Sequence, residues 1–268
     1  MLNLPYRALI QDGNHLVSYQ GNKVFPAISD VSATIFSEDI LKNRLSDIAN
    51  DERFYHLHIV DQVIFEAAVS YFSELNAAWC NLPLATVMIS SPGEVYRGKR
   101  LDYTSDALPV EISWFDLDRK IYLSESSQFY LELRLLQQKI QKVFSIYNSF
   151  RKEKADFAHL SEFQHIEFEG KVSFEKNIEI AQGLMRALAK RLIAKARPSL
   201  AYFLTDEDIE QFSVSFDAKN FHRISLKQAL AMLKKDTGDS RYDAFSLQSF
   251  GAWEEVRLTE LLGKHAVV

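Results

Sequence analysis

Apolar residues recur every three or four positions in several stretches of the chain, a spacing that places them on one face of a helix. The clearest stripe runs from Val60 to Leu75 and predicts one long amphipathic helix. Ser225 is expected to cap the start of another helix, and Pro198 is expected to end one, because an interior proline removes a backbone hydrogen bond. Five further helices are predicted over residues 37–49, 127–140, 177–197, 226–235 and 253–262.

Other stretches alternate between apolar and polar residues, as half-buried strands do. Residues 142–153 and 161–171 are two such runs joined by a polar segment, and they predict an antiparallel hairpin. The odd-numbered positions of each strand share one face, and the apolar opposite face is expected to pack against helices. Further strands are predicted over residues 82–90, 110–114, 121–124 and 211–216, and another is expected to begin after Gly263.

No repeat, low-complexity segment or Pro/Gly-rich linker divides the chain. The mixture of helices and strands predicts an α+β fold in which helices flank an antiparallel sheet. We expect one mixed domain over residues 51–268. Residues 1–50 form an N-terminal extension, for which the pattern predicts only short strands or loops and the helix that starts at residue 37.

The chain has 268 residues, a formal net charge of −5 and only 9 glycines. The motifs of P-loop and dinucleotide-binding proteins are both absent, which excludes those two classes of nucleotide site. The net acidity argues against an attraction of the whole surface to nucleic acid. No signal peptide begins the chain, and no stretch approaches the ~18 apolar residues of a membrane helix. We therefore expect a cytoplasmic protein that does not bind membranes.

Thiol and metal chemistry are not indicated by the sequence. Cys80 is the only cysteine and is expected to be a small buried apolar residue rather than a reactive thiol. His56 and His58 have no partners at zinc-ligand spacing and are expected to be solvent-exposed or capping residues at the start of the long helix. Glu167 and Glu169 share a strand face and could bind Mg²⁺ weakly, but such pairs are more often solvated. No metal site is predicted.

The odd-numbered face of the hairpin gathers side chains that suit a nucleotide together with a carboxylate substrate. A guanidinium can fork onto two oxygens, an aromatic ring can stack on adenine, and a carboxylate can accept a hydrogen bond from the adenine amine. The alternative is a surface hairpin with solvated charges. The side chains of this face are Tyr147, Ser149, Arg151 and Glu153 on the first strand and Phe163, His165, Glu167 and Glu169 on the second.

Three segments, in this order along the chain, resemble class II aminoacyl-tRNA synthetases, in particular the asparaginyl, aspartyl and lysyl subclass. Motif 1, a long helix followed by a strand with a proline, resembles residues 67–90, which include AAWCNLPLATVMIS. The strand-to-helix element of asparaginyl enzymes resembles YLSESSQFYLE, residues 122–132. Motif 2, with Phe-Arg-x-Glu and then His-Leu-[ST]-Glu-Phe, resembles FRKEKADFAHLSEFQHIEFEG within residues 143–171. The resemblance implies a class II synthetase-like core.

The resemblance also implies roles for the matching residues of the hairpin. Arg151 would grip the α-phosphate of ATP and the reacting carboxylate, as the catalytic residue. Glu153 would contact the adenine amine, and Phe163 would stack on the base. His159 would lie near the terminal phosphates. ATP and Mg²⁺ are the implied substrate and cofactor.

Two residues outside the hairpin match the amino-acid site of the family. Gln128 matches its amino-acid-binding glutamine, and Glu132 stands where asparaginyl enzymes place a carboxylate that faces the substrate amide. Aspartyl enzymes typically carry a Lys one residue earlier, where this chain has Leu131. A carboxylate repels a substrate carboxylate but accepts hydrogen bonds from an amide, so asparagine is favoured over aspartate. Pro83 would lie at a homodimer interface.

Two parts of the family pattern are missing from this sequence. The residues before the long helix are too few for the anticodon-binding OB-fold, which is a five-stranded barrel. The glycine-rich motif 3 is also absent, so the C-terminal half of the active site is expected to be incomplete. The resemblance therefore supports two functions. One is an ATP-dependent ligase that forms an aminoacyl-adenylate and passes the amino acid to tRNA or to ammonia. The other is a non-catalytic paralogue that serves as an accessory or dimerisation protein. Outside the resemblance, an unrelated binding module is the remaining alternative, and it would show neither nucleotide affinity nor the helix-strand dimer interface.

Overall fold

The computed structural model of the chain describes residues 17–19, 22–24, 38–87, 95–96, 99–100, 109–113, 120–152, 160–244 and 252–263. The chain separates into two compact units, and each is described by itself. The second unit takes its described residues from Ala68–Asn177, and the first takes its own from the stretches on either side. Helices α3 (Glu52–Glu74) and α5 (Phe174–Phe203) contribute residues to both units. The division of the chain at residue 50 stays a prediction.

The second unit is built on the predicted hairpin. Strands β9 (Lys142–Phe150) and β10 (Glu162–Gly170) are antiparallel, and the short strand β3 (Ala78–Trp79) pairs with β9 in parallel. Ser149 lies opposite Phe163 and Tyr147 lies opposite His165. Because directly opposite residues share a face, the odd-numbered positions of both strands lie on the same side of the sheet, as predicted.

A second small sheet belongs to the same unit, with the strand order β4, β8, β7. Its strands β4 (Ala85–Thr86), β7 (Glu111–Ile112) and β8 (Ile121–Leu123) are antiparallel. The last two confirm the strands predicted near residues 110 and 121. The strand predicted over residues 82–90 is reduced to β4 within the described part, and Leu84 and Val87 beside it are exposed rather than buried. Strands β5 (Val95–Tyr96) and β6 (Lys99–Arg100) form a separate pair.

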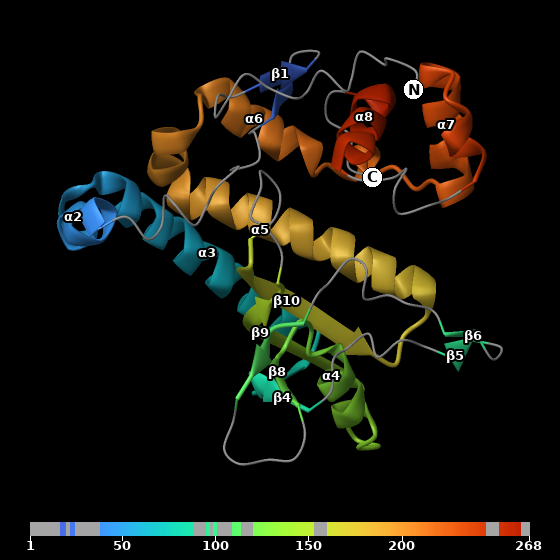
Figure 1. Cartoon of the computed structure of the whole chain (residues 1–268), viewed down its shortest axis with the longest axis horizontal. Helices are drawn as coiled ribbons and strands as arrows, with labels where there is room; N and C mark the ends of the chain where they lie inside the picture. The colour runs from blue at the N-terminus through green and yellow to red at the C-terminus, as the bar shows by residue number, and fades with distance from the viewer. Residues whose placement is uncertain are drawn as a thin grey trace. The chain divides into compact units, whose positions relative to one another are not determined.

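The two faces of the hairpin carry different partners (Figure 1). On the even-numbered face, Phe72 of α3 stacks on Phe144 and Phe168, with ring centroids 4.8 and 5.6 Å apart. On the odd-numbered face, helix α4 (Gln128–Leu135) packs against both strands. Its Leu131 is fully buried against Val143 and Cys80. The expectation that Cys80 is buried is confirmed, and burial raises the pKa of its thiol.

The first unit is mainly helical. A cluster of Val63, Leu192, Leu200 and Ile209 joins α3, α5 and α6 (Asp206–Ser215). A second cluster joins α7 (Leu226–Thr237) to α8 (Ala252–Leu262) through Leu230, Leu233 and Leu258. This unit also contains α2 (Glu38–Asn50), the strand pair β1 (Val17–Tyr19) and β2 (Asn22–Val24), and the short 3-10 helices η3 (Ala218–Asn220) and η4 (Ser240–Asp243).

Most predicted helices are present, and Ser225 caps α7 as expected, in a reciprocal capping box with Gln228. The prediction that Pro198 ends a helix is only partly right, because the first helical segment is interrupted two residues earlier and a second segment includes the proline. Ala196 leaves helical geometry at φ −122° and ψ 15°, and the helix resumes to Phe203. Pro198 therefore lies in the first turn after a kink, where its missing N–H removes no hydrogen bond.

Two further predictions in the first unit are wrong. The strand predicted over residues 211–216 is part of α6, which begins at a capping box formed by Thr205 and Asp208. His56 does not lie before the long helix, because α3 begins at Glu52. Its ring stacks on Tyr202 at 4.5 Å, and its Nδ1 lies 3.1 Å from Ser199 Oγ. The strand expected after Gly263 lies outside the described residues.

Candidate functional site

Arg151 continues the odd-numbered face of the hairpin beyond the last residue of β9. Its backbone N–H donates to the Ser161 carbonyl at 2.9 Å, which extends the ladder between the two strands by one residue. Its half-buried guanidinium lies over the Phe163 ring, with 5.3 Å between the guanidinium carbon and the ring centroid. This is the geometry of a cation–π contact. The contact places a positive charge, which can bind anionic oxygens, beside the face of an aromatic ring.

The middle of this face is a hydrogen-bonded group of polar side chains. His165 Nδ1 lies 2.8 Å from Ser149 Oγ and 3.3 Å from the Tyr147 hydroxyl. Burial lowers the pKa of His165, and the charge of Arg151 adds to that effect while the charge of Glu167 opposes it. The imidazole is therefore favoured in its neutral form, in which one ring nitrogen accepts and the other donates.

Glu167 follows His165 on the same face of β10 and accepts hydrogen bonds from two hydroxyl groups. The Tyr147 hydroxyl donates to its Oε2, and Ser126 Oγ donates to its Oε1 at 3.1 Å. Burial, followed by the hydrogen bond to Glu167, raises the pKa of Tyr147 to about 12. Tyr147 therefore keeps its proton at neutral pH. Glu167 is half-buried rather than simply solvated, and each of its two oxygens accepts a hydrogen bond from a protein hydroxyl group.

The far end of the face is acidic. Gln128 and Glu132 are exposed one turn apart on α4, and Gln128 Nε2 donates to Glu132 Oε1 at 3.1 Å. Burial raises the pKa of Glu169 to about 7, and the charges of Glu132 and Glu167 add to the effect. Glu169 therefore lies close enough to Glu132 and to Glu167 to feel the charge of each. A substrate group that donates hydrogen bonds or carries positive charge suits this end of the face.

The structure brings the predicted site residues together in two pairs. Arg151 and Phe163 form one pair, and Gln128 and Glu132 form the other. Pro83 is exposed just before β4. The remaining predicted residues, Glu153 and His159, lie outside the described residues.

Sequence reasoning assigned no role to Tyr147, Ser149 or His165, although strand alternation placed all three on the correct face. Ser126 was missed entirely. It lies in the turn before α4, and no local pattern indicates that its hydroxyl contacts β10. The signal that could have identified the other three is the strand register, since residues that face one another across a hairpin share their partners.

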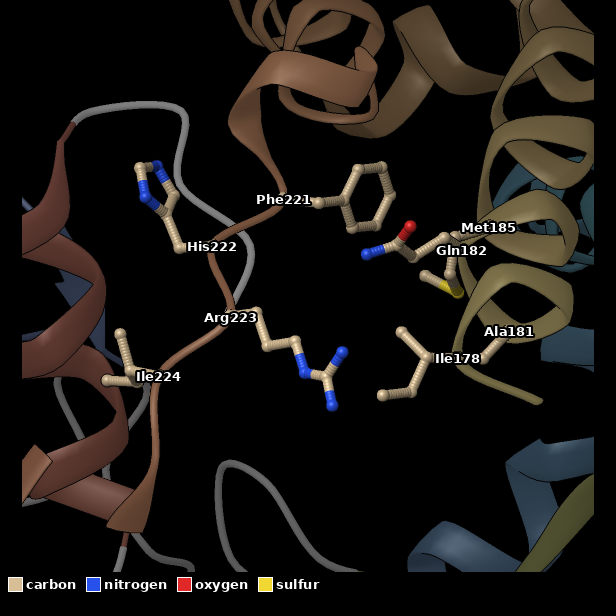
Figure 2. A pocket seen from close by; sticks show the side chains of 8 residues that line it. All are labelled: Ile178, Ala181, Gln182, Met185, Phe221, His222, Arg223 and Ile224. Carbon is tan, nitrogen blue, oxygen red and sulfur yellow. The ribbon is translucent and has the colours of Figure 1, made fainter. Parts of the chain in front are cut away.

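A separate pocket of about 340 Å³ lies in the first unit, between α5 and residues 221–224. Figure 2 shows Phe221 and Arg223 pointing towards α5, and Gln182 and Ile178 pointing back from that helix. Arg186 lies over the Phe221 ring, 5.5 Å from its centroid. None of the residues that were predicted to bind a substrate lines this pocket, so the hairpin face is the candidate site.

Two absences hold for the described part of the chain. Its helices include none with the length and apolar character needed to cross a membrane. No group of three or more His, Cys, Asp or Glu side chains among these residues is arranged to hold a metal ion. The Mg²⁺ that the resemblance implies stays a prediction, because this ion is usually bound by one or two carboxylates together with the phosphates of the substrate.

The comparison with protein families gives one match. Residues 100–251 match the model of class II tRNA synthetases (D, K and N), which is more than half of the chain. The match includes the strand-to-helix element before α4 and both strands of the hairpin. No curated protein matches the chain.

Solved structures with a similar fold include three of asparaginyl-tRNA synthetases. The enzyme from Pyrococcus horikoshii in complex with asparaginyl-adenylate has a TM-score of 0.66 and 22% sequence identity. A second structure of the Pyrococcus horikoshii enzyme has a TM-score of 0.62 and 20% sequence identity. The enzyme from Entamoeba histolytica in complex with asparaginyl-adenylate has a TM-score of 0.60 and 17% sequence identity. Each alignment covers 90% of this chain and between 49% and 51% of the other, so this chain spans about half the length of these relatives.

Proposed function

Since the chain belongs to the class II tRNA synthetase family of the D, K and N type, we propose that it activates an amino acid by forming an aminoacyl-adenylate from ATP. Asparagine is the favoured substrate, with aspartate second. The fold match to two structures that hold asparaginyl-adenylate supports the reaction. The observation that carries the proposal is the hairpin face, which has a guanidinium with an aromatic ring at one end and an amide with three carboxyl groups at the other.

In the proposed reaction, a carboxylate oxygen of the amino acid attacks the α-phosphorus of ATP. The bond between that phosphorus and the bridging oxygen breaks, and pyrophosphate leaves with the bonding electrons. Arg151 binds the α-phosphate and the attacking carboxylate together, which aligns the reacting atoms and offsets the negative charge that gathers between them. Phe163 supplies the stacking plane for adenine. Glu153 and His159 keep the roles that the resemblance implies.

Gln128 and Glu132 bind the amino acid at the other end of the face. Gln128 already donates one amide hydrogen to Glu132, which leaves the carboxylate with further lone pairs for a substrate amide. A substrate carboxylate at the same place would face like charge. This difference favours asparagine over aspartate.

The proposal also covers assembly and location. Exposed Pro83, with the 61% exposed Trp79 on β3 nearby in the chain, supports a homodimer interface at motif 1. The acceptor of the activated amino acid is tRNA or ammonia, and the location is cytoplasmic.

Exchange of labelled pyrophosphate into ATP tests the adenylate step. We expect exchange that depends on asparagine, with weaker stimulation by aspartate. Arg151→Ala should reduce this exchange by at least 100-fold, on the order expected for a charge that stabilises the transition state, while the circular dichroism spectrum stays unchanged. The matched control is Arg53→Ala, which removes an exposed arginine that pairs with Asp51. If no amino acid stimulates exchange while the chain still forms dimers, the non-catalytic accessory role replaces the enzyme.

A further inference from the structure

Helix α4 begins without a side-chain cap from its N-cap residue. The first N–H groups of a helix have no partner within the helix and need one from elsewhere. Ser127 is the N-cap residue, but its side chain makes no capping hydrogen bond. Its hydroxyl lies instead 2.9 Å from Ser124 Oγ, in a fully buried pair. The start of α4 is therefore held by other groups.

Two hydroxyl bridges bind the first two amides at this end of the helix, ahead of those that a side-chain cap would bind. The backbone N–H of Ser127 donates to the Tyr147 hydroxyl at 2.7 Å, and that hydroxyl donates to Glu167. The backbone N–H of Gln128 donates to Ser126 Oγ at 3.2 Å, and that hydroxyl donates to Glu167 at 3.1 Å. Two successive amides thus reach the two oxygens of one carboxylate, each through one hydroxyl. The negative charge also lies at the helix end where it is stabilising.

The bridges lie beside the proposed amino-acid site. Gln128 is the first residue of α4, and Glu132 lies one turn later. The position of both side chains relative to the hairpin therefore depends on how the start of α4 is tied to β9 and β10. Tyr147 is buried at 7% exposure, so its hydroxyl acts through Ser127 and Glu167 rather than by contact with a substrate in solution.

We propose that Tyr147, together with Ser126, is a positioning residue that ties the start of α4 to Glu167 and so holds Gln128 and Glu132 in place for the amino acid. The inference rests on the proposed function for the identity of the ligand. The connection between the start of α4 and Glu167 does not depend on that function. Hydrogen exchange tests this connection, and pyrophosphate exchange tests its role in binding the amino acid.

Hydrogen exchange of the whole chain tests the tie. Tyr147→Phe removes the acceptor of the Ser127 amide and one donor to Glu167. We expect amides 127–131 to exchange about tenfold faster, which corresponds to the loss of one hydrogen bond, while amides of β9 and β10 exchange at the original rate. Ser126→Ala should accelerate the Gln128 amide in the same way. Tyr122→Phe, which removes a hydroxyl from β8, is the matched control and should leave α4 unchanged.

Steady-state pyrophosphate exchange tests the link to the amino acid. Tyr147→Phe should raise KM for asparagine about tenfold and leave KM for ATP and kcat within about twofold to threefold. A residue with only a structural role would not separate the two KM values. Ser126→Ala should produce the same separation and guards against a folding defect in the tyrosine variant.

The outcomes separate the two proposals. Unchanged exchange of α4 amides, or equal acceleration throughout the second unit, overturns the tie. A parallel rise of both KM values, or no change in either, overturns its role in binding the amino acid. If the unaltered chain shows no pyrophosphate exchange while Tyr147→Phe still loosens α4 alone, the tie stands and the proposed function fails.

Discussion

Arg151 and Phe163 come from different strands of the hairpin, and the guanidinium carbon of one lies 5.3 Å from the ring centroid of the other. The contact depends on the strand register, which puts Phe163 opposite Ser149, two residues before Arg151 on the same face. The ring supports the charged group from one side and limits the directions in which it can turn. This pair therefore links the charge proposed for the α-phosphate to the plane proposed for adenine.

Replacing Phe163 with Leu should weaken the binding of ATP without affecting the binding of the amino acid. The change keeps an apolar side chain but removes both the stacking plane and the cation–π contact, together about 1–2 kcal/mol. We expect KM for ATP to rise about tenfold in pyrophosphate exchange and KM for asparagine to stay within about twofold. Phe129→Leu, at a partly exposed ring on α4, is the control. An equal effect of both variants would contradict the assignment of Phe163 to ATP.

Replacing Glu132 with Gln should reduce the preference for asparagine over aspartate. The variant keeps the shape of the side chain but removes the negative charge that opposes a substrate carboxylate. We expect the ratio of kcat/KM for the two amino acids to fall about tenfold, mainly because aspartate becomes a better substrate. Competition between the two amino acids in the exchange assay measures this ratio. Glu74→Gln, at the exposed end of α3, should leave the ratio unchanged.

Glu169 should make the protein less stable as the pH rises. Its pKa is raised from 4.5 to about 7, so between these values the folded chain binds more protons than the unfolded chain. Stability therefore falls as pH rises through this window. Glu169→Gln should remove the penalty and stabilise the protein at pH 8 by about 1–2 kcal/mol, a figure reduced for solvent screening, with little effect at pH 4.

Urea unfolding of Glu169→Gln and the unaltered chain at the two pH values measures the difference. Glu179→Gln, at an exposed position on α5, is the control for loss of one surface charge. Equal stabilisation by Glu169→Gln at pH 4 and pH 8 would show that the charge of Glu169 is not the cause.

Phe72 should be the most sensitive position for stability on α3. It is 1% exposed and stacks on both Phe144 and Phe168. Phe72→Ala removes a ring from between a helix and a sheet and should cost about 3–5 kcal/mol. Phe65→Ala, on the same helix at 54% exposure, should cost less than about 1 kcal/mol. Chemical denaturation of the two variants checks the difference, and similar losses would contradict the packing described here.

The hairpin could be predicted from the sequence because the alternation of apolar and polar residues in each strand is a local signal. The same alternation was misleading at residues 211–216, where Phe, Val and Phe occupy every second position but residues 211–215 lie in α6. Helical spacing also joins Ile209 to Phe212, and both contribute to the core cluster. The capping box of Thr205 and Asp208, which starts six residues before the predicted strand, is the signal that indicates a helix.

Other features depend on contacts that no local pattern encodes. Pro198 is expected to end a helix, and the sequence alone does not show that Ala196 changes direction first and lets a new first turn accept the proline. The same holds for Ser126, whose hydroxyl is separated by 41 positions from the carboxylate that it binds. The pairs of the candidate site could be identified because their residues match a known motif. The hydroxyl bridges from the start of α4 to Glu167 are visible only in the folded chain.

The alternation of even- and odd-numbered positions in the hairpin limits where this chain can gain or lose residues. Even-numbered positions such as Phe144 and Phe168 pack against a helix, and odd-numbered positions such as Tyr147 and Glu167 carry the polar network. Because strand side chains alternate with a period of two, an insertion or deletion of one residue within β9 would move the β9 side chains on one side of the change to the opposite face. It would bury polar groups beside Phe72 and turn aromatic rings towards α4. Related chains should therefore differ in length between the two strands, but not within them.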